Sequence, residues 1–160
     1  MSKSGKRIIL ASAGVIMLLC VAVCAYFYWD YGTSHRFSAS DYKEYPNAEY
    51  SLSIAESSPD YYYAVGWVAV KDYFPAFFHT QLVLYYEDSS EMLRFPMNLR
   101  EDASITQVMN DGIDHSSAGF ERNIKKKHLE DQTCLVGFLF DLDQTEMLVK
   151  TGRPLSDFLG

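Results

Sequence analysis

The chain has little cysteine, and the cysteines are placed where they cannot cross-link a domain. Of the three, Cys20 and Cys24 lie within the uncharged run 8–29, and only Cys134 follows that run. No intrachain disulfide can therefore form in residues 30–160, so a hydrophobic core must stabilise that part of the chain. Roughly 110–120 residues are enough to build such a core.

Metal-binding and catalytic signatures are also lacking. Four histidines are scattered without the spacing of zinc ligands: His35, His79, His115 and His128. The turn at 110–114 does not match an EF-hand loop. Residues 40–43 fit S-x-x-K and residues 150–152 fit K-T-G, but the S-D-N motif that should accompany them is missing. We predict no metal site, no cofactor and no catalytic residue.

Positive charge is scarce after residue 30. All 21 acidic residues but only 11 of the 14 basic ones lie in 30–160, which gives this segment a net charge of −10. Such a surface repels phosphate backbones, so we predict no nucleic-acid partner. The acidic balance is compatible with an exported surface domain.

A long apolar run is the first feature that is present. Residues 8–29 contain no charged side chain. A helix of this length, with a rise of about 1.5 Å per residue, spans roughly 33 Å, enough for the hydrocarbon core of a bilayer. Lys3, Lys6 and Arg7 precede the run, which predicts a cytoplasmic N-terminus and an extracellular remainder.

A cleaved signal peptide is the competing interpretation of this run. Its apolar region should be about 7–15 residues long and end in a small-residue cleavage site. The best candidate site, Ala22-Val-Cys24, lies deep inside a longer run. We therefore predict an uncleaved single-pass anchor in the cell membrane. The expected organisation is a cytoplasmic tail at 1–7, a transmembrane helix at 8–29, a juxtamembrane linker at 30–48 and an extracytoplasmic domain at 49–160.

Period-2 patterns dominate the last of these segments. In 91–99, Leu93 and Phe95 share one face and Arg94 takes the other, while Pro96 indicates an edge or a bulge. Residues 133–142 are apolar on both faces, as in a central strand. Shorter strands are expected at 49–54, 61–70, 79–86, 119–124 and 145–151, and a short helix after Asp102. About seven strands predict an all-β fold, an immunoglobulin-like β-sandwich, with a small barrel as the alternative.

The aromatic stretch 61–78 divides into two parts. Residues 61–70 fit a strand with Tyr61, Tyr63, Val65 and Trp67 on one face, which we expect to be core. Residues 71–79 form a connection that contains Pro75 and is unusually aromatic. Its rings either fold back over the edge of the sandwich or form an exposed contact patch. The candidate binding residues are Tyr73, Phe74, Phe77 and Phe78.

A second candidate site is electrostatic. Lys125, Lys126 and Lys127 form the single basic cluster of an acidic segment. Three neighbouring ammonium groups suit a phosphate-rich wall polymer or lipid headgroups, although most such runs are solvated turns.

Several short pieces of the chain carry a family resemblance. They are Gly66-Trp67, Leu82-Val-Leu84, Arg100-Glu-Asp102, Ser117-Ala-Gly119-Phe120, Leu129 before the strand at 134–142, and Lys150-Thr151. With these, residues 64–151 resemble a β-rich accessory domain of Gram-positive bacterial envelope proteins, which is sometimes fused to surface-polysaccharide glycosyltransferases. The aromatic loop 71–79 departs from this pattern. The resemblance implies an accessory or interaction role and brings no catalytic residue with it.

Cys134 supports the one enzymatic alternative. A membrane-anchored extracytoplasmic β domain with a single cysteine is also the outline of a sortase-like cysteine transpeptidase, with His79 as base and Arg153 as oxyanion partner. The residues before Cys134 are LEDQT rather than the aliphatic threonine motif of that family. We therefore expect a non-catalytic binding or scaffolding domain at the bacterial cell envelope. Its expected partner is a cell-wall polysaccharide, the membrane surface or a membrane protein.

Overall fold

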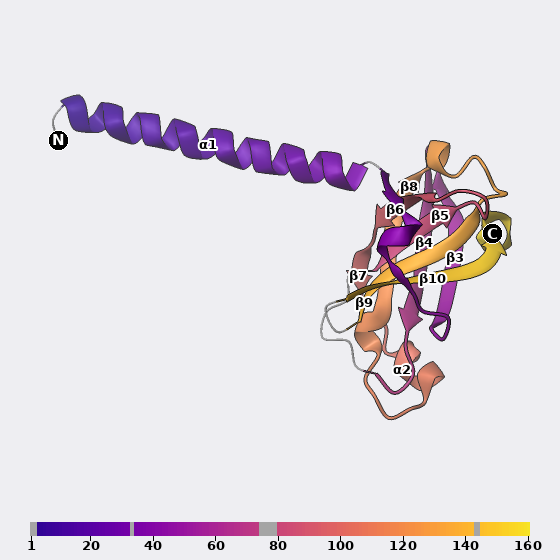
Figure 1. Ribbon diagram of the computed structural model, residues 1–160. Helices are drawn as coiled ribbons and strands as arrows, with labels where there is room; N and C mark the ends of the chain where they lie inside the picture. The colour runs from indigo at the N-terminus through magenta and orange to yellow at the C-terminus, as the bar shows by residue number, and fades with distance from the viewer. Residues whose placement is uncertain (1–2, 33, 74–79, 143–144) are drawn as a thin grey trace. The chain divides into compact units, whose positions relative to one another are not determined.

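The computed structural model describes residues 3–32, 34–73, 80–142 and 145–160 (Figure 1). Two units are distinguished, residues 1–34 and residues 35–160. The first is a single helix, α1 (Lys3–Gly32), which includes the predicted segment 8–29. In the described part of the chain, no helix is long and apolar enough to cross a membrane.

The second unit is built from two antiparallel-rich sheets. One has six strands in the order β1-β6-β5-β9-β10-β2 and the other has four in the order β3-β4-β8-β7. The bounds are β1 His35–Ser38, β2 Lys43–Glu44, β3 Glu49–Ser58, β4 Tyr61–Ala69, β5 Gln81–Tyr85, β6 Glu91–Pro96, β7 Asn98–Arg100, β8 Gly119–Lys125, β9 Leu135–Leu142 and β10 Thr145–Pro154. The all-β class is confirmed. The described strands form two separate sheets rather than the single closed barrel of the alternative.

The main core lies between the two sheets. Ile54, Ala64 and Phe120 enter it from the four-stranded sheet, and Leu82 and Phe138 enter it from the six-stranded sheet. The rings of Phe120 and Phe138 meet with centroids 5.7 Å apart. Full burial of each large apolar side chain contributes about 1.5–3 kcal/mol relative to exposure. This core holds the two sheets face to face without any disulfide.

The predicted strand at 91–99 is divided between the two sheets. β6 ends at Pro96 and pairs with β1 and β5, whereas β7 begins at Asn98 and pairs with β8. Pro96 lacks an N–H and still pairs with Gln81, and the Met97 N–H donates to the Thr80 carbonyl oxygen at 3.1 Å before the chain enters the other sheet. The predicted central strand is confirmed: β9 lies between β5 and β10 and is buried on both faces.

Short helical segments complete this unit. α2 (Ser104–Met109) buries Ile105 and Met109 of the i, i+3, i+4 set that the sequence predicts but leaves its third member, Val108, exposed, and it ends at Asn110 with a φ of 46°. The remaining turns are η1 (Ala39–Asp41), η2 (Ser116–Ala118), η3 (Lys126–His128) and η4 (Leu155–Phe158).

The segment predicted as a linker at 30–48 is largely folded into the domain, which corrects that boundary. β1 pairs with β6 at one edge of the six-stranded sheet, and β2 pairs with β10 at the other edge. Between them, Phe37 and Tyr42 pack on a second apolar cluster on the outer face of this sheet, formed by Val83, Tyr85, Met92, Leu139 and Leu148. The Phe37 and Tyr42 rings meet edge to face at 5.1 Å. Tertiary burial therefore orders a stretch that has no periodic pattern of its own.

Candidate functional site

The rings of β4 lie on the face opposite to the one predicted. Ala64 and Val68 are fully buried in the main core, and Tyr62 packs against it. Because side chains alternate along a strand, Tyr61, Tyr63, Val65 and Trp67 lie on the outer face of the four-stranded sheet, where each is partly buried. The prediction that these residues are core is therefore wrong for Tyr61, Tyr63 and Val65, whereas Trp67 packs against a separate buried cluster.

Trp67 has its own small apolar cluster on that outer face. It packs against Ala69, Ile105, Met109 and Ala118, and it remains partly exposed. On β8 the residue paired with Trp67 is Gly119. A Cβ at Gly119 would lie 2.4 Å from the carbonyl oxygen of Arg100, so the close approach of β7 excludes any side chain there.

Small and polar side chains flank the aromatic row of β4. On the β3 side, the residues of the same face are exposed and short: Ser51, Ser53, Ala55 and Ser57. On the β8 side, Tyr63 donates a hydrogen bond of 2.5 Å to Glu121, and this bond raises the pKa of Tyr63. The Glu121 carboxylate also lies 3.9 Å from the Arg100 guanidinium. We name this surface the β4 face.

The β4 face was missed because sequence reasoning assigned its rings to the core. One signal was present in the sequence: the alternation of serine and alanine with Leu52 and Ile54 in 51–57 gives β3 one polar, small face. That pattern predicts which side of β3 faces outward. Because paired strands share their faces, the pairing of β3 with β4 would also have predicted which side of β4 faces outward.

The predicted aromatic loop is described only at its start. Tyr73 is partly buried and packs against the main core, as the fold-back interpretation expects. Phe74, Phe77 and Phe78 lie outside the described residues, as does His79. Asp72 precedes Tyr73 with a φ of 60°, and its N–H donates to Asp111 Oδ2 at 2.8 Å.

Asp111 joins this loop start to the turn after α2. Its Oδ2 also lies 2.9 Å from His115 Nε2, and its Oδ1 accepts from the Ile113 N–H at 3.0 Å. Both the Asp111 and His115 side chains are fully buried. The hydrogen bond from His115, followed by those from the two backbone amides, holds the pKa of Asp111 well below its usual value. The arrangement is structural: it fastens two turns to each other.

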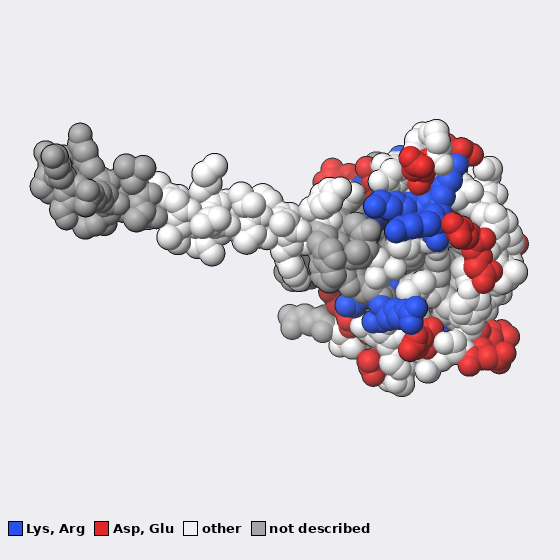
Figure 2. All heavy atoms as spheres, turned by 90° about the horizontal axis from the view of Figure 1, so that it is seen from above, with Lys and Arg blue, Asp and Glu red and all other residues white. Residues whose placement is uncertain are grey.

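The three predicted lysines lie at the end of β8 and in η3, the orange turn at the top of Figure 1. Lys126 is paired with Glu56 and lies over the Tyr62 ring at 5.3 Å. Lys125, Lys126 and Lys127 line a hollow of about 570 Å³ that also includes Asp60 and Glu130. These carboxylates offset much of the positive charge. Figure 2 likewise shows basic side chains bordered by acidic ones on the face in view.

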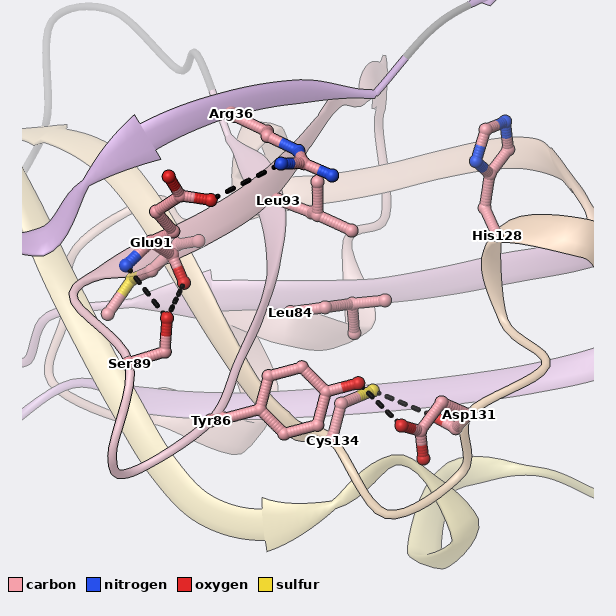
Figure 3. Close-up of a pocket in the computed structure, with 10 residues that line it drawn as sticks. Arg36, Leu84, Tyr86, Ser89, Glu91, Leu93, His128, Asp131 and Cys134 are labelled. Carbon is pink, nitrogen blue, oxygen red and sulfur yellow. Dashed lines mark hydrogen bonds and ion pairs between the residues drawn. The ribbon is translucent and has the colours of Figure 1, made fainter.

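Cys134 lies beside a smaller hollow of about 190 Å³ (Figure 3). Leu84 and Leu93 lie between Arg36 on one side and Tyr86 and Cys134 on the other. Arg36 is paired with Glu91 at 3.4 Å, and both side chains are largely exposed.

The Cys134 thiol and the Tyr86 hydroxyl both donate hydrogen bonds to Asp131. Cys134 Sγ donates to the carbonyl oxygen of Asp131 at 2.9 Å, and Tyr86 donates to Asp131 Oδ2 at 2.5 Å. Burial raises the pKa of Cys134 to about 11, with a further contribution from the charge of Asp131. The bond to Asp131 raises the pKa of Tyr86 to about 12. With a pKa of about 11, roughly one Cys134 in four thousand is a thiolate at pH 7.4, whereas a nucleophile needs the thiolate.

Of the other two residues of the enzymatic alternative, His79 lies outside the described residues and Arg153 is engaged elsewhere. Arg153 pairs with Asp157 at 3.1 Å and lies over the Phe158 ring at 4.6 Å. His128 lines the same hollow as Cys134, and burial together with Lys127, Lys125 and Arg122 lowers its pKa.

Within the described ranges, no group of three or more His, Cys, Asp or Glu residues is placed to hold a metal ion. No protein-family model, curated protein or solved structure matches the chain.

Proposed function

We propose that the protein is a single-pass membrane protein whose N-terminal helix anchors a non-catalytic binding or scaffolding domain outside the cell, at the bacterial cell envelope. The domain is proposed to be immunoglobulin-like in its two-sheet arrangement. Its proposed partners are a cell-wall polysaccharide, the membrane surface or a membrane protein.

The exposure of apolar side chains around α1 carries the proposal. Val15, Ile16, Met17, Leu18 and Leu19 are consecutive, and their exposed fractions run from 57% to 72%. Successive helical residues are about 100° apart, so these five cover the whole circumference. A helix that is apolar on every side needs an apolar environment, either a protein interior or a bilayer. The described residues of the main core all belong to 35–160.

The sequence supports the same conclusion. The uncharged run extends over 8–29, and the cationic residues precede it, which favours a cytoplasmic N-terminus. The high pKa of Cys134 and its burial support a binding role over the sortase-like alternative.

Fractionation of cells that express the full chain tests the anchor. The wild-type chain should remain in the membrane pellet after an alkaline carbonate wash. Ile16→Arg with Leu19→Arg should release it, because an arginine at a helix centre costs about 2.5–3.5 kcal/mol on insertion. The matched control is Leu99→Arg with Val108→Arg, which replaces equally exposed apolar residues of the domain (57% and 60%).

The control chain should stay in the membrane, and protease added to intact cells should digest its domain. Recovery of the wild-type chain in the wash, or a domain protected from external protease, would contradict the proposed anchor or its orientation.

A further inference from the structure

We propose that the β4 face binds an uncharged polysaccharide, with the sugar chain lying along β4 across its aromatic row. This inference rests on the proposed function as a binding module and names the ligand class. It moves the binding site away from loop 71–79 and the three lysines, to a surface made by β3, β4 and β8.

The rings of the β4 face are spaced along a line that suits an extended ligand. Tyr61, Tyr63 and Trp67 lie on one face of one strand, so they follow a straight line. At about 3.3 Å per residue, the row from 61 to 67 extends roughly 20 Å. Each ring combines an apolar face with a polar hydroxyl or N–H. A row of such rings suits a ligand that is extended and presents both C–H and O–H groups along its length.

A ligand can reach the rings from the β3 side of the row. On the β3 side of the row, Ser51, Ser53 and Ala55 pair with Trp67, Val65 and Tyr63 respectively. All three are exposed and none has more than one heavy atom beyond Cβ. The rings therefore stand higher than their neighbours on this side, and a chain can lie against them above β3.

Hydrogen-bonding side chains lie on both sides of the row of rings. Ser57 Oγ donates to Asn123 Oδ1 at 3.1 Å, which fixes that amide beside the row and turns its NH₂ group away from Ser57. The exposed hydroxyls of Ser51 and Ser53 form no side-chain hydrogen bond within the described part of the chain. Hydroxyl and amide groups on both sides of a ring row can each bond a sugar hydroxyl.

The charges on the β4 face favour an uncharged ligand. Glu121 accepts the hydrogen bond from Tyr63 and lies 3.9 Å from Arg100, which lies equally far from Asp102. Lys125 is paired with Tyr61 at the other end of the row, so charges of both signs border the described part of the β4 face and neither sign dominates it, although residues 30–160 have a net charge of −10. A phosphate polymer or an anionic lipid surface would need excess positive charge, and a basic peptide would need excess negative charge. An uncharged glycan needs neither.

A second copy of the chain is the competing occupant. Stable interfaces between copies are depleted of serine, alanine and glutamate. On the β4 face, Ser51, Ser53 and Ala55 line one side of the row and Glu121 lies on the other. This composition fits a hydroxylated ligand better than an apolar partner.

Titration of the full chain in detergent tests the proposal. Trp29→Phe leaves Trp67 as the only tryptophan, so its fluorescence reports directly on the face. The probes are soluble neutral polymers of glucose, N-acetylglucosamine, mannose and galactose, with poly(glycerol phosphate) and anionic phospholipid vesicles as charged comparisons. We expect at least one neutral polymer to bind, with a Kd that changes little between about 50 and about 500 mM salt.

Two substitutions on the face should weaken that binding at least about tenfold. Tyr61→Ser removes a ring, and Ser53→Lys places a long side chain above β3 without touching the core. The controls are Tyr86→Ser, which removes an exposed tyrosine elsewhere, and Ser156→Lys, which adds the same side chain at an exposed serine elsewhere. Circular dichroism should show the same fold for all four variants.

Four results would overturn the proposal: no neutral polymer binds, only the charged probes bind, binding survives both face substitutions, or Ser53→Lys breaks a concentration-dependent dimer instead. Carbonate-resistant membrane association does not involve the β4 face. A failure here with an intact anchor would therefore reject the ligand, whereas loss of the anchor with intact glycan binding would reject the membrane location.

Discussion

Cys134 should react slowly with alkylating reagents, and the expected rate follows from its surroundings. A free cysteine has a pKa of about 8.5, whereas burial raises the pKa of Cys134 to about 11. At pH 7.4 this lowers the thiolate fraction about 300-fold relative to free cysteine. A more basic thiolate is intrinsically more nucleophilic, which offsets roughly tenfold of that loss. The net rate should be about thirty-fold below that of free cysteine before burial is considered.

Burial slows the reaction further, because only 4% of Cys134 is exposed. The measurement is the rate of iodoacetamide labelling of the full chain in a Cys20→Ser, Cys24→Ser background, in buffer and in denaturant. Labelling should be slow in buffer and should reach the free-cysteine rate on unfolding. The Tyr86→Phe variant removes the bond to Asp131 and tests whether the neighbouring network shields the thiol.

Labelling in buffer at or above the free-cysteine rate would refute this reasoning. It would mean that the thiol is ionised and accessible in the folded chain, as a cysteine transpeptidase requires. The binding proposal would then have to give way to the sortase-like alternative.

Three further predictions concern stability, each measured by urea unfolding. Gly66→Ala should cost about 1–3 kcal/mol, because its Cβ would lie 2.1 Å from the Ser51 carbonyl oxygen, whereas Gly14→Ala, in open space, should change nothing. Phe138→Ala should cost about 3–5 kcal/mol, since its ring is fully buried between the sheets; an unchanged midpoint would contradict the assigned core. The pKa of Asp111 is lowered on folding. The ionised carboxylate therefore adds to the free energy of unfolding above the unfolded pKa of about 4, and this contribution is lost as pH falls below that value. Between pH 5 and pH 3 the wild type should therefore lose more stability than Asp111→Asn, and equal losses would disprove the link.

Strand identity could be predicted from the sequence where the pattern was local. The run at 133–142 is apolar on both faces and became the buried strand β9, and the spacing of Ile105 and Met109 gave the buried side of α2. Pro96 marked a real discontinuity, but its meaning was tertiary. A missing N–H predicts the end of a ladder, and it does not say that the chain continues in the opposite sheet.

The segment around β1 and β2 could not be predicted, for a different reason. Phe37 and Tyr42 are separated by three polar residues and Ala39, so neither a period of 2 nor one of 3.6 appears. Their burial depends on an apolar outer face that β5, β6, β9 and β10 build from residues between 83 and 148. Only a chain that already has this sheet offers the segment a place to pack.

The orientation of β4 shows which information a single strand does not contain. Tyrosines occupy both faces at 61, 62 and 63, and beyond them the larger side chains alternate with Ala64 and Gly66. By size alone the outer residues look like the core, yet the small ones face inward because Phe120 of the neighbouring strand fills that space. A Cβ at Gly66 would lie 3.0 Å from Phe120 Cζ. Where a neighbour's ring already fills the interior, the strand turns its small side to the core and its rings outward. The outward rings are then left at the surface, which is the condition that the proposed glycan contact requires.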